Sequence, residues 1–124
     1  MIMDVQGENT PEAASSRLLT VSSSRSGACV VVSVTGEIDI TTADRLREAL
    51  EPTGSDQRVP VVDLSGVEFM GSVGLSVLLA LAARAEPERV RVVVSTPARR
   101  PIEITGLDQV LALFDTLDAA LSHG

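Results

Sequence analysis

Ser72 is the residue of this chain whose surroundings most suggest chemistry. It lies in residues 68–75, which read EFMGSVGL. An apolar run precedes this stretch and a leucine-rich run follows it, so the pattern predicts a turn from a strand into a helix. A serine in such a turn is a helix cap, a nucleophile or a phosphate acceptor.

The nucleophile interpretation fails on the residues around Ser72. A hydrolase nucleophile elbow has the pattern G-x-S-x-G. Residues 70–74 read MGSVG, in which the first glycine is displaced by one position. The only candidate general base is His123, the next-to-last residue. We therefore expect no serine hydrolase and assign no catalytic residue.

The composition excludes further classes of site. The chain contains no lysine, and both a Walker A loop and Schiff-base chemistry require one. Asp63, as a phosphoacceptor of the receiver-domain kind, would also need a lysine in its site. One cysteine and one histidine cannot make a Cys/His metal site. Cys29 is expected to be a small buried hydrophobe. No metal and no cofactor are expected.

The interpretation of Ser72 as a phosphate acceptor makes smaller demands. Free N–H groups and the helix dipole stabilise a phosphoserine at a helix N-terminus. The phosphate would add about −1.5 to −2 charges beside Val73, Val77 and Ala80, which lie on one mostly apolar helix face with Arg84. This face predicts a docking surface for another protein. The alternatives are that a neighbouring helix covers it or that it is buried in a homodimer.

Length and charge restrict the partners. The 124 residues carry a net charge of −7 and contain 2% aromatic residues. An acidic chain with few aromatic residues suits neither phosphate backbones nor base stacking, so no nucleic acid is expected. No apolar stretch is long enough to span a bilayer, and residues 1–16 have no signal-peptide features. A cytoplasmic protein is expected.

The hydrophobic pattern predicts the elements that position Ser72. Before Ser72 they are a strand RLLTV (17–21), a hairpin turn or phosphorylation tract SSSRSG (22–27), a strand ACVVVSV (28–34), a helix with a capping box at Thr41 and Asp44 that ends at Pro52 and Gly54, and a strand VPVVDL (59–64). A helix then runs from Ser72 to about Glu86, and a strand RVRVVVS (89–95) follows it. The remaining elements are a helix in PARRPIEITG (97–106) whose regular part begins at Pro101, a helical turn and a strand in LDQVLALF, and a last helix from Asp115 and Asp118 to Leu121.

A hairpin followed by strand–helix–strand units predicts an α/β fold, with a mixed β-sheet and helices packed on it. Residues 1–16 are expected to be a disordered tail and residues 17–122 a single domain. In the helix after Ser72, the face predicted to lie against the sheet carries Leu75, Leu78, Leu79 and Ala82.

Three segments, taken together, resemble the STAS-domain anti-sigma factor antagonists over roughly residues 17–122. GEIDITTADRLREAL (36–50) is similar to the family's G-E-L-D segment and first helix. VVDLSGVEFMGSVGLSVLL (61–79) is similar to its D-L-S-G-V-x-F-[IM]-D-S-S-G-L stretch. ITGLDQVLALFDTLDAAL (104–121) resembles its ending. Their order and spacing make the resemblance specific.

The resemblance implies a STAS-type fold and a binding protein that is not an enzyme. In the family, the unphosphorylated antagonist binds an anti-sigma factor, often a GHKL-type serine kinase, and a sigma factor is released. The kinase phosphorylates a serine that aligns with Ser72, and a PP2C-type phosphatase reverses this. The resemblance places Asp39 near this site. The expected partner-binding residues are Asp39, Gly71, Ser72, Val73, Ser76, Val77 and Ala80.

The chain departs from the family pattern at two positions beside Ser72. Gly71 stands where the family has aspartate, and Val73 stands where it has a second serine. These departures keep a second interpretation open. In it, the domain is a non-switching STAS scaffold or complex subunit, of the stressosome-like or lipid-transport kind.

Overall fold

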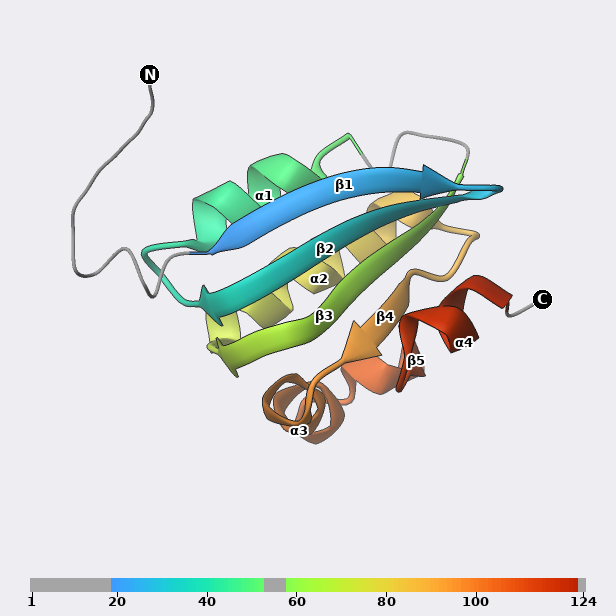
Figure 1. The fold of residues 1–124 in the computed structure, drawn as a ribbon. Helices are drawn as coiled ribbons and strands as arrows, with labels where there is room; N and C mark the ends of the chain where they lie inside the picture. The colour runs from blue at the N-terminus through green and yellow to red at the C-terminus, as the bar shows by residue number, and fades with distance from the viewer. Residues whose placement is uncertain (1–18, 53–57, 123–124) are drawn as a thin grey trace, which may run out of the picture.

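The structure, a computed structural model, describes residues 19–52 and 58–122 (Figure 1). The predicted tail at residues 1–16, Gly54 and His123 lie outside these ranges. Within them the elements are β1 (Thr20–Ser26), β2 (Cys29–Ile38), α1 (Ala43–Leu50), β3 (Val59–Met70), α2 (Ser72–Ala85), β4 (Arg91–Val94), α3 (Thr96–Ile104), η3 (Leu107–Gln109), β5 (Ala112–Phe114) and α4 (Leu117–Ser122).

The strands form one mixed sheet, as the sequence predicts. The sheet has five strands in the order β1-β2-β3-β4-β5. β1 pairs with β2 antiparallel, and the following pairs are parallel. Val31 lies opposite Val61, and Val62 opposite Val92, so β-branched side chains line neighbouring strands across the sheet centre.

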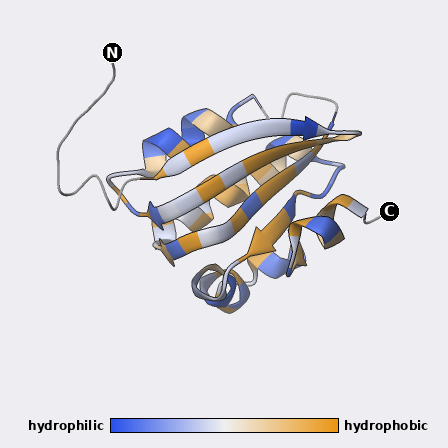
Figure 2. Cartoon of the chain, in the orientation of Figure 1, coloured by the Kyte–Doolittle hydropathy of each residue, from blue (hydrophilic) through white to orange (hydrophobic). Residues whose placement is uncertain are grey.

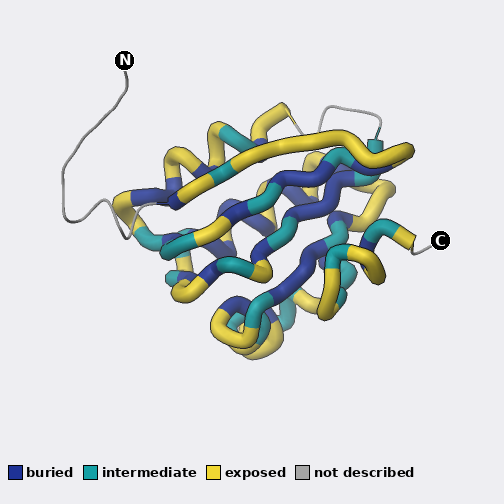
Figure 3. The backbone as a smooth tube through the Cα atoms, viewed as in Figure 1, coloured by how far each residue is buried: buried dark blue, intermediate teal, exposed yellow. Residues whose placement is uncertain are grey.

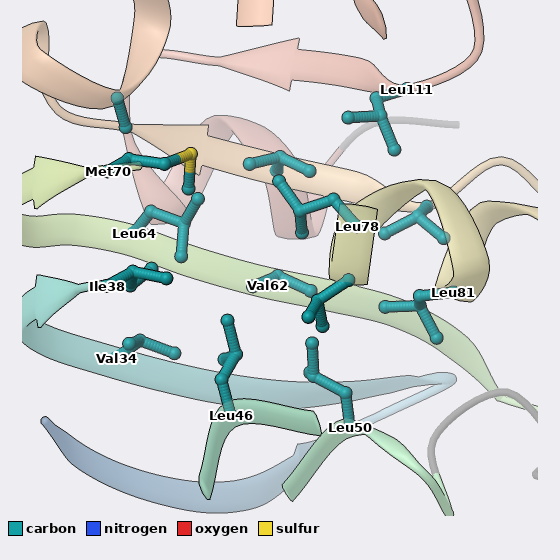
Figure 4. Packing of buried hydrophobic residues seen from close by; sticks show 14 of the residues in the cluster. Val34, Ile38, Leu46, Leu50, Val62, Leu64, Met70, Leu78, Leu81 and Leu111 are labelled. Atoms are coloured by element: carbon teal, nitrogen blue, oxygen red, sulfur yellow. The ribbon is translucent and has the colours of Figure 1, made fainter. Parts of the chain in front are cut away.

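Helices cover the two faces of the sheet unequally. Leu46 of α1 and Leu78 of α2 belong to the larger core cluster on one face (Figure 4), and so does Ile102 of α3. On the other face, Ala120 of α4 belongs to a smaller cluster with residues of β2, β3 and β4. Figure 2 shows many hydrophobic residues in β2, β3 and β4, whereas most of β1 is pale, near the middle of the hydropathy scale.

The two central strands are longer than predicted. β2 continues through Gly36 to Ile38, and β3 continues through Gly66 to Met70. Gly36 has a φ of 105° beside an irregularity in the β2–β3 ladder. A bulge with a glycine at positive φ absorbs an extra residue without ending the strand pairing. Both strands therefore end together, at the edge of the sheet formed by the carboxyl ends of its parallel strands.

The serine-rich segment is a strand and not the predicted loop. Ser22 and Ser24 pair with β2, and the hairpin turn is at Gly27, whose φ is 59°. β1 is an edge strand, and it is exposed along most of its length (Figure 3). A solvated edge accepts polar side chains, and serine there also limits pairing with other chains.

α3 begins earlier than predicted. It starts at Thr96, and Pro101 lies inside it. The Ser95 hydroxyl accepts a hydrogen bond from the Ala98 N–H at 3.2 Å, which caps the helix. Pro97 occupies the first turn, where a missing N–H costs no helical bond.

The buried face of α2 differs from the prediction. Leu78 and Leu81 are fully buried, as Figure 4 shows, whereas Leu79 is 51% exposed. Val77, predicted on the outer face, is buried. The reason is that α2 packs against α1 as well as the sheet. The buried arc is therefore wide and turned toward α1, which a single-helix pattern does not reveal.

We expect Gly74→Ala to destabilise the fold. A Cβ at this position would lie 2.7 Å from Cγ2 of Ile38 and 3.2 Å from Cγ of Met70. Both neighbours are buried at the end of the central strands. Overpacking of a core costs about 1–3 kcal/mol, which outweighs the gain of about 1 kcal/mol that alanine normally brings to a helix.

Chemical denaturation of the wild type and Gly74→Ala measures the loss in the free energy of unfolding. Ser76→Ala, at an exposed position of the same helix, is the control and should stay within about 0.5 kcal/mol of the wild type. A Gly74→Ala variant more stable than the wild type would contradict the close approach of α2 to the sheet.

Candidate functional site

The pairing of β2 with β3 brings the predicted site residues to one edge of the sheet. Ile38 lies opposite Met70, and the Gly71 N–H donates a hydrogen bond to the Ile38 carbonyl oxygen at 2.8 Å. Asp39 directly follows Ile38, and Ser72 directly follows Gly71. Figure 1 shows β2 and β3 ending together where α1 and α2 begin. Segments that are distant in sequence are thus neighbours here.

Ser72 is an exposed residue at the start of α2 and is not its cap. Gly71 is the N-cap residue, with an extended backbone at φ −83° and ψ 174°, and no side chain caps the helix. Ser72 is the first helical residue and is exposed. Its hydroxyl makes no hydrogen bond to the residues that the structure describes. The cap interpretation of Ser72 is therefore wrong, and the hydroxyl is available to another protein.

Asp39 is held in a defined conformation by the two threonines that follow it. Its Oδ1 accepts hydrogen bonds from the Thr41 hydroxyl at 2.6 Å and from the Thr41 N–H at 2.9 Å. The Thr42 hydroxyl accepts from the Asp39 N–H at 3.0 Å and donates to the Glu37 carbonyl oxygen at 2.8 Å. Thr42, and not the predicted Thr41, is the N-cap residue of α1.

These bonds favour the ionised form of Asp39. The hydrogen bond from the Thr41 hydroxyl is the main cause that lowers the pKa of Asp39 below 3.8, and the backbone N–H of Thr41 adds to it. Asp39 therefore carries a negative charge at neutral pH. It places a fixed carboxylate on the same sheet edge as Ser72.

The other predicted partner-binding residues lie along α2 but do not form one exposed stripe. Ser76 and Ala80 are exposed, and Val73 is half-buried. Val77 is 4% exposed. Ser76, Val77 and Ala80 line a shallow hollow between α1 and α2 together with Arg47 and Arg84. The predicted apolar outer face is thus narrower than expected, because α1 covers Val77.

The described residues contain no histidine and no lysine that could act as a general base on Ser72. They contain no group of three or more His, Cys, Asp or Glu side chains that could hold a metal. Asp63 lies within β3 and not at a strand end, and its Oδ1 accepts a hydrogen bond from the Ser65 N–H at 3.0 Å. No helix in the described ranges is long and apolar enough to cross a membrane.

Sequence reasoning did not identify two exposed hydrophobic residues at the same edge. Phe69 is 50% exposed and Ile40 is 86% exposed. The signal for Phe69 was the alternation of side chains along a strand, because Phe69 and the buried Met70 cannot point to the same face. Ile40 gave no such signal, since it lies in the loop between β2 and α1.

We expect the pKa of Asp39 to rise toward 3.8 in Thr41→Val, because this change removes the hydroxyl donor and keeps the N–H. The lowered pKa means that the ionised carboxylate stabilises the fold above pH 3.8, and that this contribution is lost as the pH falls through the lowered value. Carbon-detected NMR titration of the Asp39 carboxyl measures the change.

Thr20→Val, an exposed threonine on β1, is the matched control and should leave the titration of Asp39 unchanged. The same Asp39 pKa in the wild type and in Thr41→Val would show that the hydroxyl does not bind the carboxylate in solution.

The chain is similar to known proteins over most of its length. Residues 21–117 match the family model described as "Mlab, STAS domain". The anti-sigma-F factor antagonist RsfB of Mycobacterium tuberculosis is 40% identical over 107 residues, which cover 84% of this chain and 88% of RsfB. This degree of identity over most of both chains shows a common family.

Solved structures agree with this relationship. The crystal structure of an anti-sigma factor antagonist from Mycobacterium paratuberculosis is 44% identical, with a TM-score of 0.79 over 84% of this chain and 92% of that one. The anti-sigma factor antagonist SpoIIAA in its unphosphorylated form shares the fold, with a TM-score of 0.64 at 18% identity over 82% of this chain and 93% of that one. The chain therefore belongs to the STAS-domain family of anti-sigma factor antagonists, which are regulators and not enzymes.

Proposed function

We propose that the unphosphorylated protein binds an anti-sigma factor of the GHKL serine-kinase type, and that phosphorylation of Ser72 switches this binding off. Binding would release a sigma factor for transcription, and a PP2C-type phosphatase would restore the active form. The proposal also takes residues 17–122 as one STAS domain that acts in the cytoplasm. The observation that carries it is the exposed, unbonded hydroxyl of Ser72 beside Asp39, in a chain of the antagonist family.

The start of α2 suits a phosphoserine. The Gly74 N–H donates to the Gly71 carbonyl oxygen at 3.0 Å, and no side chain caps the helix. The first N–H groups of a helix have no partner within it and favour an anion, as does the helix dipole. The fold would therefore tolerate the phosphate, and the effect of phosphorylation would fall on the partner.

The surroundings of Ser72 explain why a phosphate would weaken binding. Asp39 is ionised at the same edge, and Phe69 and Ile40 expose hydrophobic side chains there. A phosphate adds about −1.5 to −2 charges at neutral pH. A partner that buries these side chains would have to desolvate the phosphate or meet its charge beside Asp39, and both cost affinity.

Packing does not require glycine at position 71 in place of the family's aspartate. A Cβ at this position would lie 3.5 Å from the Ile38 carbonyl oxygen and 3.5 Å from Cε2 of Phe69, which are ordinary contacts. Its φ of −83° is open to any residue. The site could therefore hold the family's aspartate, and glycine at this position changes the surface and not the fold.

A second candidate function keeps the fold and omits the switch. The protein would then be a STAS scaffold or a subunit of a stressosome-like or lipid-transport assembly. The observation that favours it is the replacement of the family's D-S-S by Gly71-Ser72-Val73. The loss of the family's carboxylate beside Ser72 would alter recognition by a cognate kinase.

We expect the cognate anti-sigma kinase and ATP to add one phosphate to the wild type and none to Ser72→Ala. Intact mass spectrometry after incubation with each GHKL-type kinase of the source genome measures this. The control Ser76→Ala, changed at an exposed serine one turn further along α2, should still gain one phosphate. An unmodified wild type with every kinase would favour the non-switching function.

We expect Ser72→Glu to bind the anti-sigma factor at least about tenfold more weakly than the wild type, which corresponds to about 1.4 kcal/mol. The physical reason is the negative charge placed beside Asp39 and the exposed hydrophobic side chains. Titration calorimetry gives the affinities, and circular dichroism should show an unchanged fold. Ser76→Glu is the matched control, expected to bind more tightly than Ser72→Glu. Equal affinities of wild type and Ser72→Glu would contradict the switch.

A further inference from the structure

The sheet edge that carries Ser72 exposes more hydrophobic surface than its sequence pattern suggests. Phe69 is 50% exposed at the end of β3, and Ile40 is 86% exposed in the loop after β2. The hydrogen bond between Gly71 and Ile38 joins the two segments that carry them. Exposed hydrophobic side chains that lie together on a surface are typical of interaction sites.

Gly71 leaves part of the Phe69 ring uncovered. A Cβ at position 71 would lie 3.5 Å from Cε2 and 3.8 Å from Cζ of the ring, so any larger side chain would lie against this ring edge. Glycine leaves this contact area to a partner. Val73, half-buried in the next turn, is also apolar. The departures at positions 71 and 73 therefore both make the surface around Ser72 less polar.

The two segments that carry this hydrophobic surface contain charged residues of one sign only. Residues 36–42 and 68–76 contain Glu37, Asp39 and Glu68 and no basic residue. Glu68 is exposed, and Asp39 is held in place by Thr41. An apolar centre with an acidic rim is complementary to an apolar side chain surrounded by basic groups.

We infer that Phe69, Ile40 and Gly71, which has no side chain, form the apolar anchor of the docking surface. The partner that fits this anchor is an anti-sigma factor that inserts an apolar side chain surrounded by basic residues. The inference rests on the proposed function and adds the chemistry of the partner. In this arrangement Gly71 determines specificity, because an aspartate there would place a carboxylate where the partner brings an apolar group.

The test compares substitutions at the anchor with substitutions at exposed hydrophobic residues elsewhere. Phe69→Ser is matched by Leu79→Ser, since the two side chains are 50% and 51% exposed. Ile40→Ser is matched by Ile104→Ser at the end of α3, which is 72% exposed. The probe is the purified anti-sigma kinase that binds the wild type, and titration calorimetry gives the affinities. Thermal melting shows whether each variant is folded. Ile40→Ser lies in an exposed loop, so it still tests the anchor if Phe69→Ser does not fold.

We expect Phe69→Ser and Ile40→Ser to weaken binding by about tenfold or more, as anchor residues of interfaces do. Leu79→Ser and Ile104→Ser should stay within about twofold of the wild type, as near-neutral positions do. Gly71→Asp should also weaken binding of the unphosphorylated protein, although it restores the family's residue. Raised salt should weaken wild-type binding, because charges at the rim are screened.

The outcomes separate this inference from the proposed function. If the anchor variants bind like their matched controls while Ser72→Glu binds more weakly, the inference of an anchor is wrong and the proposed phosphorylation switch is kept. If Gly71→Asp binds as tightly as the wild type or more tightly, the specificity role of Gly71 is overturned. A wild type that binds none of the anti-sigma kinases of its genome overturns the proposed function, and the anchor with it.

Discussion

The parallel pairing of β2 with β3 is the constraint on which the rest of the structure depends. It gives the sheet its two longest strands, fills the core with Val32, Val62 and their neighbours, and ends both strands at one edge. The hydrogen bond from Gly71 to Ile38 extends the pairing one residue beyond the strands. The loop with Asp39 and the start of α2 with Ser72 are therefore set by the same backbone ladder that stabilises the fold.

The close packing of α2 on this edge depends on a small residue near its start. Gly74 lets the helix approach Ile38 and Met70 closely. Val77 and Leu81 are then buried in the cluster that also contains residues of the sheet and of α1. Ser72 stays exposed at the start of the helix while Gly74 and Leu75 are already buried, so a group added to the Ser72 hydroxyl would lie on the surface and outside the core.

The same edge combines an apolar and an acidic surface, and a phosphate would weaken the binding of a partner to both. Burial of Phe69 and Ile40 by a partner makes the free energy of binding more favourable, because it removes apolar surface from water. Asp39 and Glu68 give the rim a negative charge, which favours a basic partner and opposes further negative charge. A phosphate on Ser72 would add charge beside an apolar contact without altering the backbone around it. This combination suits a binding surface controlled by modification.

The sequence by itself determined the fold class, the order of most elements and the segments around Ser72 and Asp39. Runs of valine and leucine, glycines at turns and the motif residues are patterns of neighbouring residues, so they can be recognised in the sequence alone. Strand ends were less predictable, because Gly36 and Gly66 look like breaks until a neighbouring strand supplies their hydrogen bonds.

Only the tertiary structure decided which side chains face solvent. The burial of Val77 depends on α1, the exposure of Leu79 on the rotation of α2, and the strand character of Ser22–Ser24 on their place at a sheet edge. Phe69 and Ile40 likewise are exposed where two chain segments meet. Exposure is set by contacts between elements, and the pattern within one element does not contain them.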